Sequence, residues 1–370
     1  MSANAPFVFQ VNKNDLGVLF IDLLKLEWSK ECAFAELLDS YNAGSGKITD
    51  DLKEIAENET CVLSLQVLAN PLHRTAYNTG GSMLPVSFMN VYSNNKIDQF
   101  GLVSIMPSFE NSIMIHSFDS AESYGEWFAE TVSMCSQEEI ESKLPAKFPL
   151  ESLVFILHAI DSFKRVSYKS MLDYKPVEES MIASKEYGET LKTSTDSKDI
   201  RWLLPAFSML TPNLSKYNMK LGPDYMKLLT DSKIFIPVKK SDTGEEFFKF
   251  DEVGKGLGVE FYSSWVMSVG FETVIFNSGG TEKVLNNGFL APTAFANNLF
   301  EIEKDAQGNG IINYSCLNFE GLGSKVENFM QKAIENSANV KADTLICANC
   351  GSDLNEDTKF CGKCGNKVQQ

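Results

Sequence analysis

The chain has 370 residues, of which 44% are hydrophobic and 22% are charged, a composition typical of a globular protein that buries a core. Its length exceeds what one hydrophobic core usually serves, so we expect two domains. The net charge of −16, from 33 basic and 49 acidic side chains, repels phosphate backbones and anionic lipid. Nucleic acid is therefore excluded as an expected partner.

The N-terminus gives no sign of a targeting segment. Its sequence, MSANAPFVFQVNKND, lacks a basic stretch followed by an apolar one. The most apolar run, residues 150–160, is too short to span a bilayer. We therefore expect a cytoplasmic protein without membrane insertion.

Two stretches of the chain repeat one pattern. YNTGGSM at 77–83 matches FNSGGTE at 276–282 at an offset of 199 residues, and the next two matched segments keep the same order at offsets of 197 and 198 residues. Such spacing predicts a doubled unit of helix, strand, turn, about three more strands and helix, with the first helix at 61–69 in one copy and at 258–270 in the other. We interpret the two heptapeptides as tight turns, because Asn, hydroxyl residues and paired glycines accept positive φ. The matched segments are GLVSI (101–105) with NLFEI (298–302), SIMIHSF (112–118) with GIINYSC (310–316), and the amphipathic stretches 120–133 and 321–334.

The central part of the chain is predicted to be helical. EEIESKL, FPLESLVFILHAIDSFKRVSYKSMLDY, VEESMIASKEYGETLK and DIRWLLPAFSML follow one another there, with prolines between them. We predict an α+β fold of two similar, pseudo-two-fold α/β halves, mainly antiparallel strands with flanking helices, joined by a helical insert. The predicted parts are a first half (1–134), the insert (135–230), a second half (231–335), a linker (336–345) and a small C-terminal module (346–370).

Four cysteines in the last 24 residues form the strongest chemical pattern. Cys347, Cys350, Cys361 and Cys364 make two C-x-x-C pairs, each followed directly by a glycine. Four thiolates at this spacing can surround one tetrahedral zinc ion and leave no position for water or substrate. A module this small has too little core to fold without metal, so we predict structural zinc. A redox role is disfavoured, because the whole C-x-x-C-G knuckle is repeated.

This tail resembles the short zinc ribbon found at the ends of many bacterial proteins. Leu354, Phe360 and Gly365 stand where that pattern has its leucine, its phenylalanine and its second knuckle glycine. The resemblance implies a fold and no particular task. The charges of the tail do not favour nucleic acid, so the ribbon is interpreted as a protein-binding module or a structural cap.

Two glycine-rich stretches suggest nucleotide binding but lack its essential residues. AGSGKIT at 43–49 has Ile48 where a phosphate loop has its magnesium-binding hydroxyl, and we interpret its glycines as a helix break. GKGLGV at 254–259 has Val259 where a dinucleotide fingerprint has its third glycine, and we interpret it as a turn.

No catalytic residue can be nominated. His158 lies in the apolar stretch VFILHAI and is interpreted as a core histidine rather than a base. Acidic pairs such as Glu138 with Glu139 stand in polar stretches, and no nucleophile elbow is recognised.

The organisation of about residues 10–335 resembles that of the EspG-type chaperones of type VII (ESX) secretion, which pair two similar α/β halves with helical elements. The resemblance implies a non-enzymatic, cytosolic chaperone that holds a helical secretion substrate soluble and delivers it to the export machinery. Two alternatives stay open. The chain could be an adaptor or regulatory scaffold whose ribbon recruits a protein partner, or an enzyme with an unrecognised site between the halves.

Overall fold

The computed structural model describes residues 5–81, 84–99, 101–109, 111–175, 180–264, 267–277 and 282–338, with the backbone of 345–346 and 353–354. The part of the chain before residue 135 supplies five strands and four α-helices. Two short helical stretches, Lys13–Asp15 and Val18–Leu23, precede α1. The bounds are β1 Phe7–Asn12, α1 Ala35–Asp39, α2 Asp50–Glu57, α3 Glu59–Ala69, β2 His73–Gly81, β3 Ser87–Ser93, β4 Leu102–Pro107, β5 Ser112–Phe118 and α4 Ala121–Val132.

The rest of the described chain follows the same plan with a longer helical section. Its first strand, β6, leads directly into the long helix α5. The bounds are β6 Lys147–Pro149, α5 Leu150–Leu172, β7 Met181–Ala183, α6 Ser184–Asp196, α7 Leu203–Leu210, α8 Lys227–Asp231, β8 Phe235–Lys239, β9 Glu246–Phe250, α9 Glu252–Ser264, β10 Met267–Phe276, β11 Glu282–Pro292, β12 Asn297–Lys304, β13 Gly310–Leu317 and α10 Phe319–Ala338.

The fold is α+β and is built on one large antiparallel sheet. Ten strands lie in the order β1-β5-β4-β3-β2-β10-β11-β12-β13-β6, with β2 and β10 side by side at the centre. Thr75 of β2 lies opposite Thr273 of β10, and their hydroxyl oxygens are 3.0 Å apart. These two residues are 198 positions apart. Outward from this pair, β2–β5 followed by α4 and β10–β13 followed by α10 present the same order of elements.

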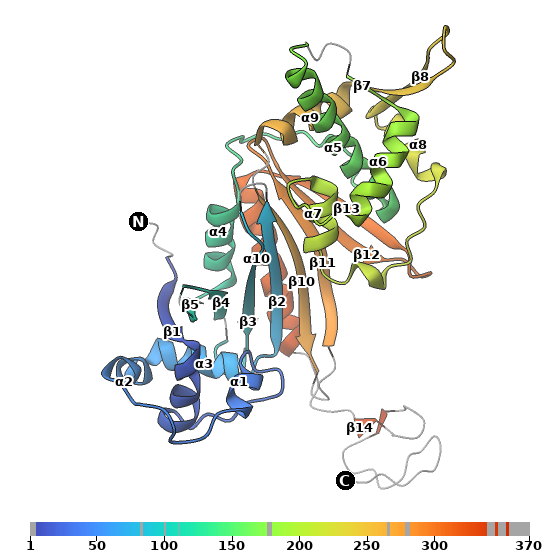
Figure 1. The fold of residues 1–370 in the computed structure, drawn as a ribbon. Coiled ribbons are helices and arrows are strands. Elements are labelled where there is room, and N and C mark those ends of the chain that lie inside the picture. The colour runs from blue at the N-terminus through green and yellow to red at the C-terminus, as the bar shows by residue number, and fades with distance from the viewer. Residues whose placement is uncertain are drawn as a thin grey trace.

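Helices α4 and α10 pack against each other on one face of the sheet (Figure 1). Gly125 of α4 meets Gly323 of α10 so closely that a Cβ on Gly125 would lie 2.5 Å from the carbonyl oxygen of Gly323. The core beneath this helix pair takes side chains from both central strands, among them Tyr77 and Phe271. The helix pair thus ties the two sides of the sheet together.

The opposite face of the sheet is covered by two unrelated segments. Residues 13–69 lie between β1 and β2 in the chain and close one hydrophobic core, at the lower end of Figure 1. Residues 150–264 lie between β6 and β10 and close another, at the upper end. We call these segments the first and the second cover. The second cover contains its own three-stranded sheet, in the order β7-β9-β8.

Several predicted elements differ from those observed. Asn78–Gly81, predicted to be a turn, continues strand β2: all four residues pair with β10, and Asn78 and Thr79 also pair with β3. Ser278–Thr281 of the second heptapeptide lie outside the described residues. The stretch 258–270, predicted to be one helix, divides into the end of α9 and the start of β10. Residues 138–144, predicted to be helical, have no regular structure.

The predicted helical insert also contains strands. β6 and β7 both lie within 135–230, and β6 pairs with β13 at the edge of the large sheet. Short strands of three residues carry too little periodicity for the sequence to reveal them. The strand SIMIHSF, by contrast, is confirmed as β5 with both faces covered.

Candidate protein-binding groove along helix α9

Helix α9 is held closely against its neighbours by glycines. A Cβ on Gly254 would lie 2.2 Å from the carbonyl oxygen of Ile234, and one on Gly258 would lie 2.3 Å from the ring of Phe163 in α5. Glycine lowers helix propensity by about 1 kcal/mol relative to alanine, so this close packing explains why glycine stands here. The predicted turn at 254–259 is therefore wrong, since the whole stretch is helical.

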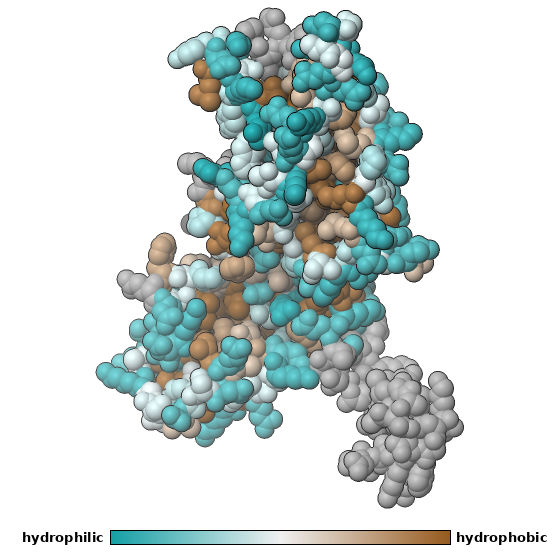
Figure 2. Space-filling model, turned by 45° about the vertical axis from the view of Figure 1, so that its right-hand side comes forward, coloured by the Kyte–Doolittle hydropathy of each residue, from teal (hydrophilic) through white to brown (hydrophobic). Residues whose placement is uncertain are grey.

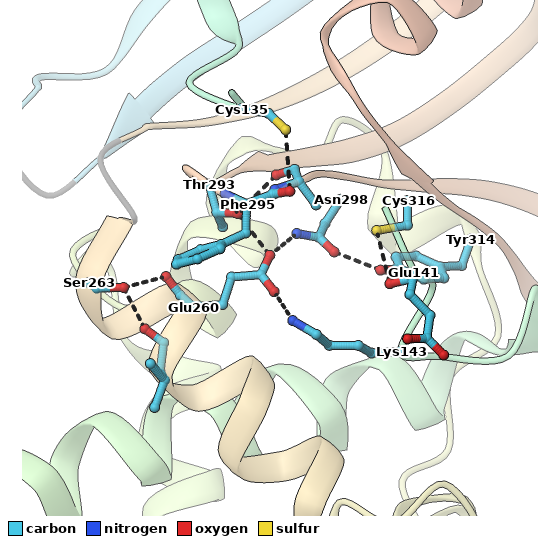
Figure 3. A network of polar contacts seen from close by, with 12 residues as sticks. Cys135, Glu141, Lys143, Glu260, Ser263, Thr293, Phe295, Asn298, Tyr314 and Cys316 are labelled. Carbon is cyan, nitrogen blue, oxygen red and sulfur yellow. Dashed lines mark hydrogen bonds and ion pairs between the residues drawn. The ribbon is translucent and has the colours of Figure 1, made fainter. Parts of the chain in front are cut away.

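A buried carboxylate fixes α9 to the large sheet (Figure 3). Glu260 is only 3% exposed, and its oxygens accept hydrogen bonds from Lys143 Nζ at 2.6 Å, Thr293 Oγ1 at 2.8 Å and Asn298 Nδ2 at 3.0 Å. The Tyr314 hydroxyl in turn donates to Asn298 Oδ1 at 2.6 Å. A buried charge is tolerated only when it is paired and hydrogen-bonded in this way. The network joins α9, the segment before β6, and strands β12 and β13.

The Cys316 thiol and the Tyr314 phenol beside this network are not activated. Burial raises the pKa of Cys316 and raises the pKa of Tyr314 well above its usual value. Both groups therefore keep their protons near neutral pH and act as hydrogen-bond donors, since a thiolate or phenolate would be needed for nucleophilic attack. Cys135 donates to the backbone carbonyl of Phe295 at 3.2 Å. The hydrogen bonds of this network therefore hold α9 in position.

A groove with apolar walls runs along the outer side of α9. Val259, 53% exposed, and Phe295, 44% exposed, form its apolar part, and Lys143 and Lys255 stand at its rim. We call this hollow of about 370 Å³, lined by Lys143, Lys255, Gly256, Val259, Glu260 and Phe295, the α9 groove.

Large apolar side chains continue from the groove to the ends of α5 and α9. The Tyr168 and Tyr262 rings lie 5.2 Å apart, and the Tyr262 hydroxyl lies 3.8 Å from Met171 Sδ. Leu172 is 75% exposed and Tyr174 is 98% exposed. We call Tyr168, Met171, Leu172, Tyr174, Val259 and Tyr262 the apolar cap. Helices α5 and α9 lie in the upper part of Figure 1. Contiguous exposed apolar surface of this kind marks interaction sites.

The surface elsewhere is mixed. Figure 2 presents a face that is mostly hydrophilic, with hydrophobic side chains gathered in its middle, between the two covers. Val86, Phe88 and Met209 are exposed large apolar side chains of this protein outside the cap. The cap differs from these side chains in carrying the most exposed large apolar residues of α5 and its end, Leu172 and Tyr174, beside the contacts that join Tyr168, Tyr262 and Met171.

The three histidines lie in separate places and are all buried. Burial lowers the pKa of His73 to about 3 and that of His158 to about 4, and it also lowers the pKa of His116. All three are therefore neutral at physiological pH. Within the part of the chain that the structure describes, no three His, Cys, Asp or Glu side chains converge as a metal site requires.

The predicted zinc ligands lie outside the described residues. Cys347, Cys350, Cys361 and Cys364 thus stay a prediction, as does the domain division. The backbone of β14 (Leu345–Ile346) pairs antiparallel with that of β15 (Asp353–Leu354), and the first cysteine pair falls in the connection between them. A hairpin around a C-x-x-C pair is the local geometry that a zinc knuckle uses.

Sequence reasoning missed the Glu260 network and the α9 groove. The one available signal was a glutamate within the apolar stretch GVEFYSSWV, because a charge on the buried side of a helix requires a partner. Its partners could not be read from the sequence.

Comparisons with known proteins give a likeness to solved structures and none at the level of sequence. No protein-family model matches the chain, and no curated protein matches its sequence. Among solved structures, the chain is similar to the Mycobacterium tuberculosis type VII secretion system chaperone EspG5, solved in complex with the PE25-PPE41 dimer. That similarity has a TM-score of 0.43 and 10% sequence identity, and it covers 90% of this chain and 96% of the other. Among the described residues, no helix has both the length and the apolar character that a bilayer crossing needs.

Proposed function

We propose that this chain is a non-enzymatic protein-binding protein that holds a helical partner in the α9 groove and against the apolar cap. The observation that carries the proposal is the contiguous apolar surface on two packed helices. A helical partner fits because amphipathic helices bury an apolar stripe in a groove of this kind. Lys255 at the rim favours an acidic side chain beside that stripe, whereas the charge of Lys143 is already paired with Glu260.

The partner class we propose is a small helical substrate of type VII secretion or a component of its export machinery. This choice rests on the resemblance of the sequence organisation to EspG-type chaperones, and it places the protein in the cytosol. Covering an apolar helix tip until export would keep such a substrate from aggregating.

A pull-down with matched variants tests the proposal. Three baits are compared. They are the unchanged full chain, a double variant in which Leu172 and Val259 are both changed to glutamate, and a control variant that carries Phe109→Glu. Phe109 is 89% exposed and lies in the β4–β5 connection, away from the cap. We expect the double variant to capture helical partners about 10-fold less well or worse, because buried apolar anchors dominate interface energies. Equal capture of the same proteins by all three baits would contradict the proposal.

We also propose that the C-terminal module is a zinc ribbon held by Cys347, Cys350, Cys361 and Cys364. The spacing of the cysteines and the paired backbone of β14 and β15 support it. Zinc analysis of the full chain would give one zinc per chain, and Cys361→Ser would abolish it. The same variant separates chaperone from adaptor, since an adaptor that recruits through the ribbon would lose a partner while the α9 groove keeps its own.

We infer further that the two halves arose by doubling of one unit. The identical order of β2–β5–α4 and β10–β13–α10 and the central Thr75–Thr273 pair, 198 positions apart, support this origin.

A further inference from the structure

Strand β1 forms one edge of the large sheet, at its left border in Figure 1, and differs from the other edges. It has six residues and pairs with β5 alone, whereas β6 at the opposite edge has three residues and ends in Pro149. In the three-stranded sheet, edge strand β7 has three residues and edge strand β8 contains Pro237. Short strands, proline and charged side chains protect sheet edges from pairing with further strands. The sequence of β1, FVFQVN, has none of these protections.

The hydrogen bonds beside β1 show which of its backbone groups point away from the sheet. The Lys13 N–H donates to the Asn111 carbonyl oxygen at 3.0 Å, and these two residues continue the register of β1 with β5. Alternate residues of a strand direct their N–H and C=O groups to the same side, so the odd-numbered residues of β1 bond to β5. The backbone groups of Val8, Gln10 and Asn12 therefore point outward. Among the described residues, β5 is the one element that forms backbone hydrogen bonds with β1.

The side chains of β1 are apolar or amide, and none is charged. Phe7 is 42% exposed and Val8 is 47% exposed. The rings of Phe7 and Phe9 lie 6.1 Å apart on the face of the first cover. Because the chain has a net charge of −16, most of its surface repels a second copy. The uncharged edge at β1 lets two copies meet without placing like charges opposite each other.

The two ends of this edge are complementary to each other. Pro6 directly precedes β1 and has a carbonyl oxygen but no N–H to donate. Asn12 is the N-cap of the short helix Lys13–Asp15, and the carbonyl oxygen of such a residue already accepts the first helical hydrogen bond. Asn12 thus offers an N–H without a carbonyl oxygen, and Pro6 offers the reverse. An antiparallel strand that places Asn12 opposite Pro6 uses both groups.

We propose that two copies of this chain pair through β1, antiparallel and related by a two-fold axis at Phe9. In this register, Val8 of each copy lies opposite Gln10 of the other, and their outward N–H and C=O groups bond to each other. Asn12 of each copy then lies opposite Pro6 of the other. Phe9 faces its own counterpart in a non-hydrogen-bonded pair, the closer kind, so the two rings form a cross-strand aromatic contact.

The neighbouring registers each lose a hydrogen bond. An axis at Val8 would place the carbonyl oxygen of Gln10 opposite Pro6, which has no N–H. An axis at Gln10 would place the N–H of Val8 opposite the carbonyl oxygen of Asn12, which the helix already uses. The α9 groove contains no residue of β1, so pairing of two copies is independent of the proposed function.

Sedimentation velocity of the full chain at a series of protein concentrations tests the proposal, and we expect a dimer. Val8→Pro removes the outward N–H and leaves the hydrogen bonds to β5 in place, because Val8 does not bond to β5. Each copy loses one hydrogen bond at the interface, so the dissociation constant should rise about 30-fold. The matched control is Val8→Thr, which keeps the N–H and the branched shape and should stay within about two-fold of the unchanged protein. Thermal unfolding checks that both variants are folded.

Disulfide trapping tests the register. Phe9→Cys should form an interchain disulfide under copper phenanthroline, because the two cysteines would face each other across the axis. Phe7→Cys, which would lie opposite Val11, should form much less. The unchanged chain under the same oxidant measures the background from its own cysteines. More trapping by Phe7→Cys than by Phe9→Cys would overturn the proposed pairing.

Other occupants of the edge give different results. If β1 instead receives an extended segment of another protein, the purified chain will be a monomer at every concentration, and the proposal fails. If the C-terminal module holds two copies together, Cys361→Ser will dissociate the dimer while Val8→Pro leaves it intact, and the proposal also fails. Capture of helical partners should be the same for Val8→Pro and the unchanged protein, so this outcome is separate from that of the α9 groove.

Discussion

The two covers occupy the same position in the two halves but are built differently. Each lies between an edge strand and a central strand, residues 13–69 after β1 and residues 150–264 after β6. The first cover closes a core, whereas the second closes a core and also carries the apolar cap and the α9 side of the α9 groove. The sheet and the helix pair α4–α10 are common to both halves. The common part therefore provides the frame, and the part without a counterpart provides most of the proposed helix-binding surface.

The largest effect should come from the frame. Gly125→Ala would place a Cβ 2.5 Å from the carbonyl oxygen of Gly323 and 3.1 Å from the backbone nitrogen of Glu327. Backbone atoms cannot move aside as a flexible side chain can, so α4 and α10 must separate. We expect the free energy of unfolding to fall by about 3 kcal/mol. Urea denaturation followed by circular dichroism measures it.

The counterpart position supplies the control. In Gly323→Ala the new Cβ would lie 3.4 Å from the carbonyl oxygen of Gly125, a distance at which a small adjustment suffices. Its effect should stay below about 1 kcal/mol, since alanine also favours the helix. Equal losses of stability in Gly125→Ala and Gly323→Ala would show that a methyl group on either helix is equally crowded. The two positions would then not differ as we expect.

The next effect concerns the attachment of the second cover to the large sheet through Glu260. Lys143→Met keeps the aliphatic stem but removes the cation from the buried Glu260 carboxylate, which still accepts from the neutral donors Thr293 and Asn298. Removing one partner of a buried ion pair typically costs 3–5 kcal/mol; because Lys143 is 36% exposed, we expect about 2 kcal/mol. Thermal or urea unfolding measures the loss. Lys255→Met, on the same rim, is the matched control and should change little.

The same contrast explains what the sequence could and could not reveal. The strands and amphipathic helices of the frame could be predicted from the sequence, because similar segments recur at a nearly constant spacing, as SIMIHSF and GIINYSC do. The Glu260 network could not be predicted, because the partners of Glu260 lie 117, 33 and 38 positions away in the chain. Local periodicity carries no information about such contacts. Likewise, the glycines of 254–259 suit a turn when read locally, and only the packing of Ile234 and Phe163 explains them in a helix.

A smaller, pH-dependent effect distinguishes the central strands. His73 of β2 is fully buried between Ser93, 3.1 Å from Nδ1, and Thr75, 2.8 Å from Nε2, whereas the position 198 residues later holds Phe271. Burial lowers the pKa of His73 to about 3, from an ordinary value of 6.5. As the pH falls, the His73 imidazole of the unfolded chain therefore binds a proton before that of the folded chain does. The free energy of unfolding decreases as the pH falls below 6.5. Between about pH 7.5 and 5.5 this group should remove about 1.4 kcal/mol.

His73→Phe isolates that contribution. The variant should lose stability less steeply on acidification than the unchanged protein, because it carries no imidazole to protonate. Asp161, whose pKa burial raises to about 7, titrates in both proteins and cancels in the difference. Urea titrations at a series of pH values give the two slopes, and parallel curves would refute the assignment to His73.

The smallest effect concerns the ion pair that links the halves at the surface. Arg74 of β2 lies 3.2 Å from Glu282 of β11, with the two side chains 33% and 49% exposed. Strand pairing between β2 and β10 and the buried Thr75–Thr273 contact already join the halves. An exposed pair adds little to such a contact, because water and salt screen it. Glu282→Gln should therefore cost about 0.3 kcal/mol at low salt and nothing measurable at high salt. A loss above about 1.5 kcal/mol that persists at high salt would mean that the halves depend on this charge pair, and the buried centre of the sheet would then not be what holds them together.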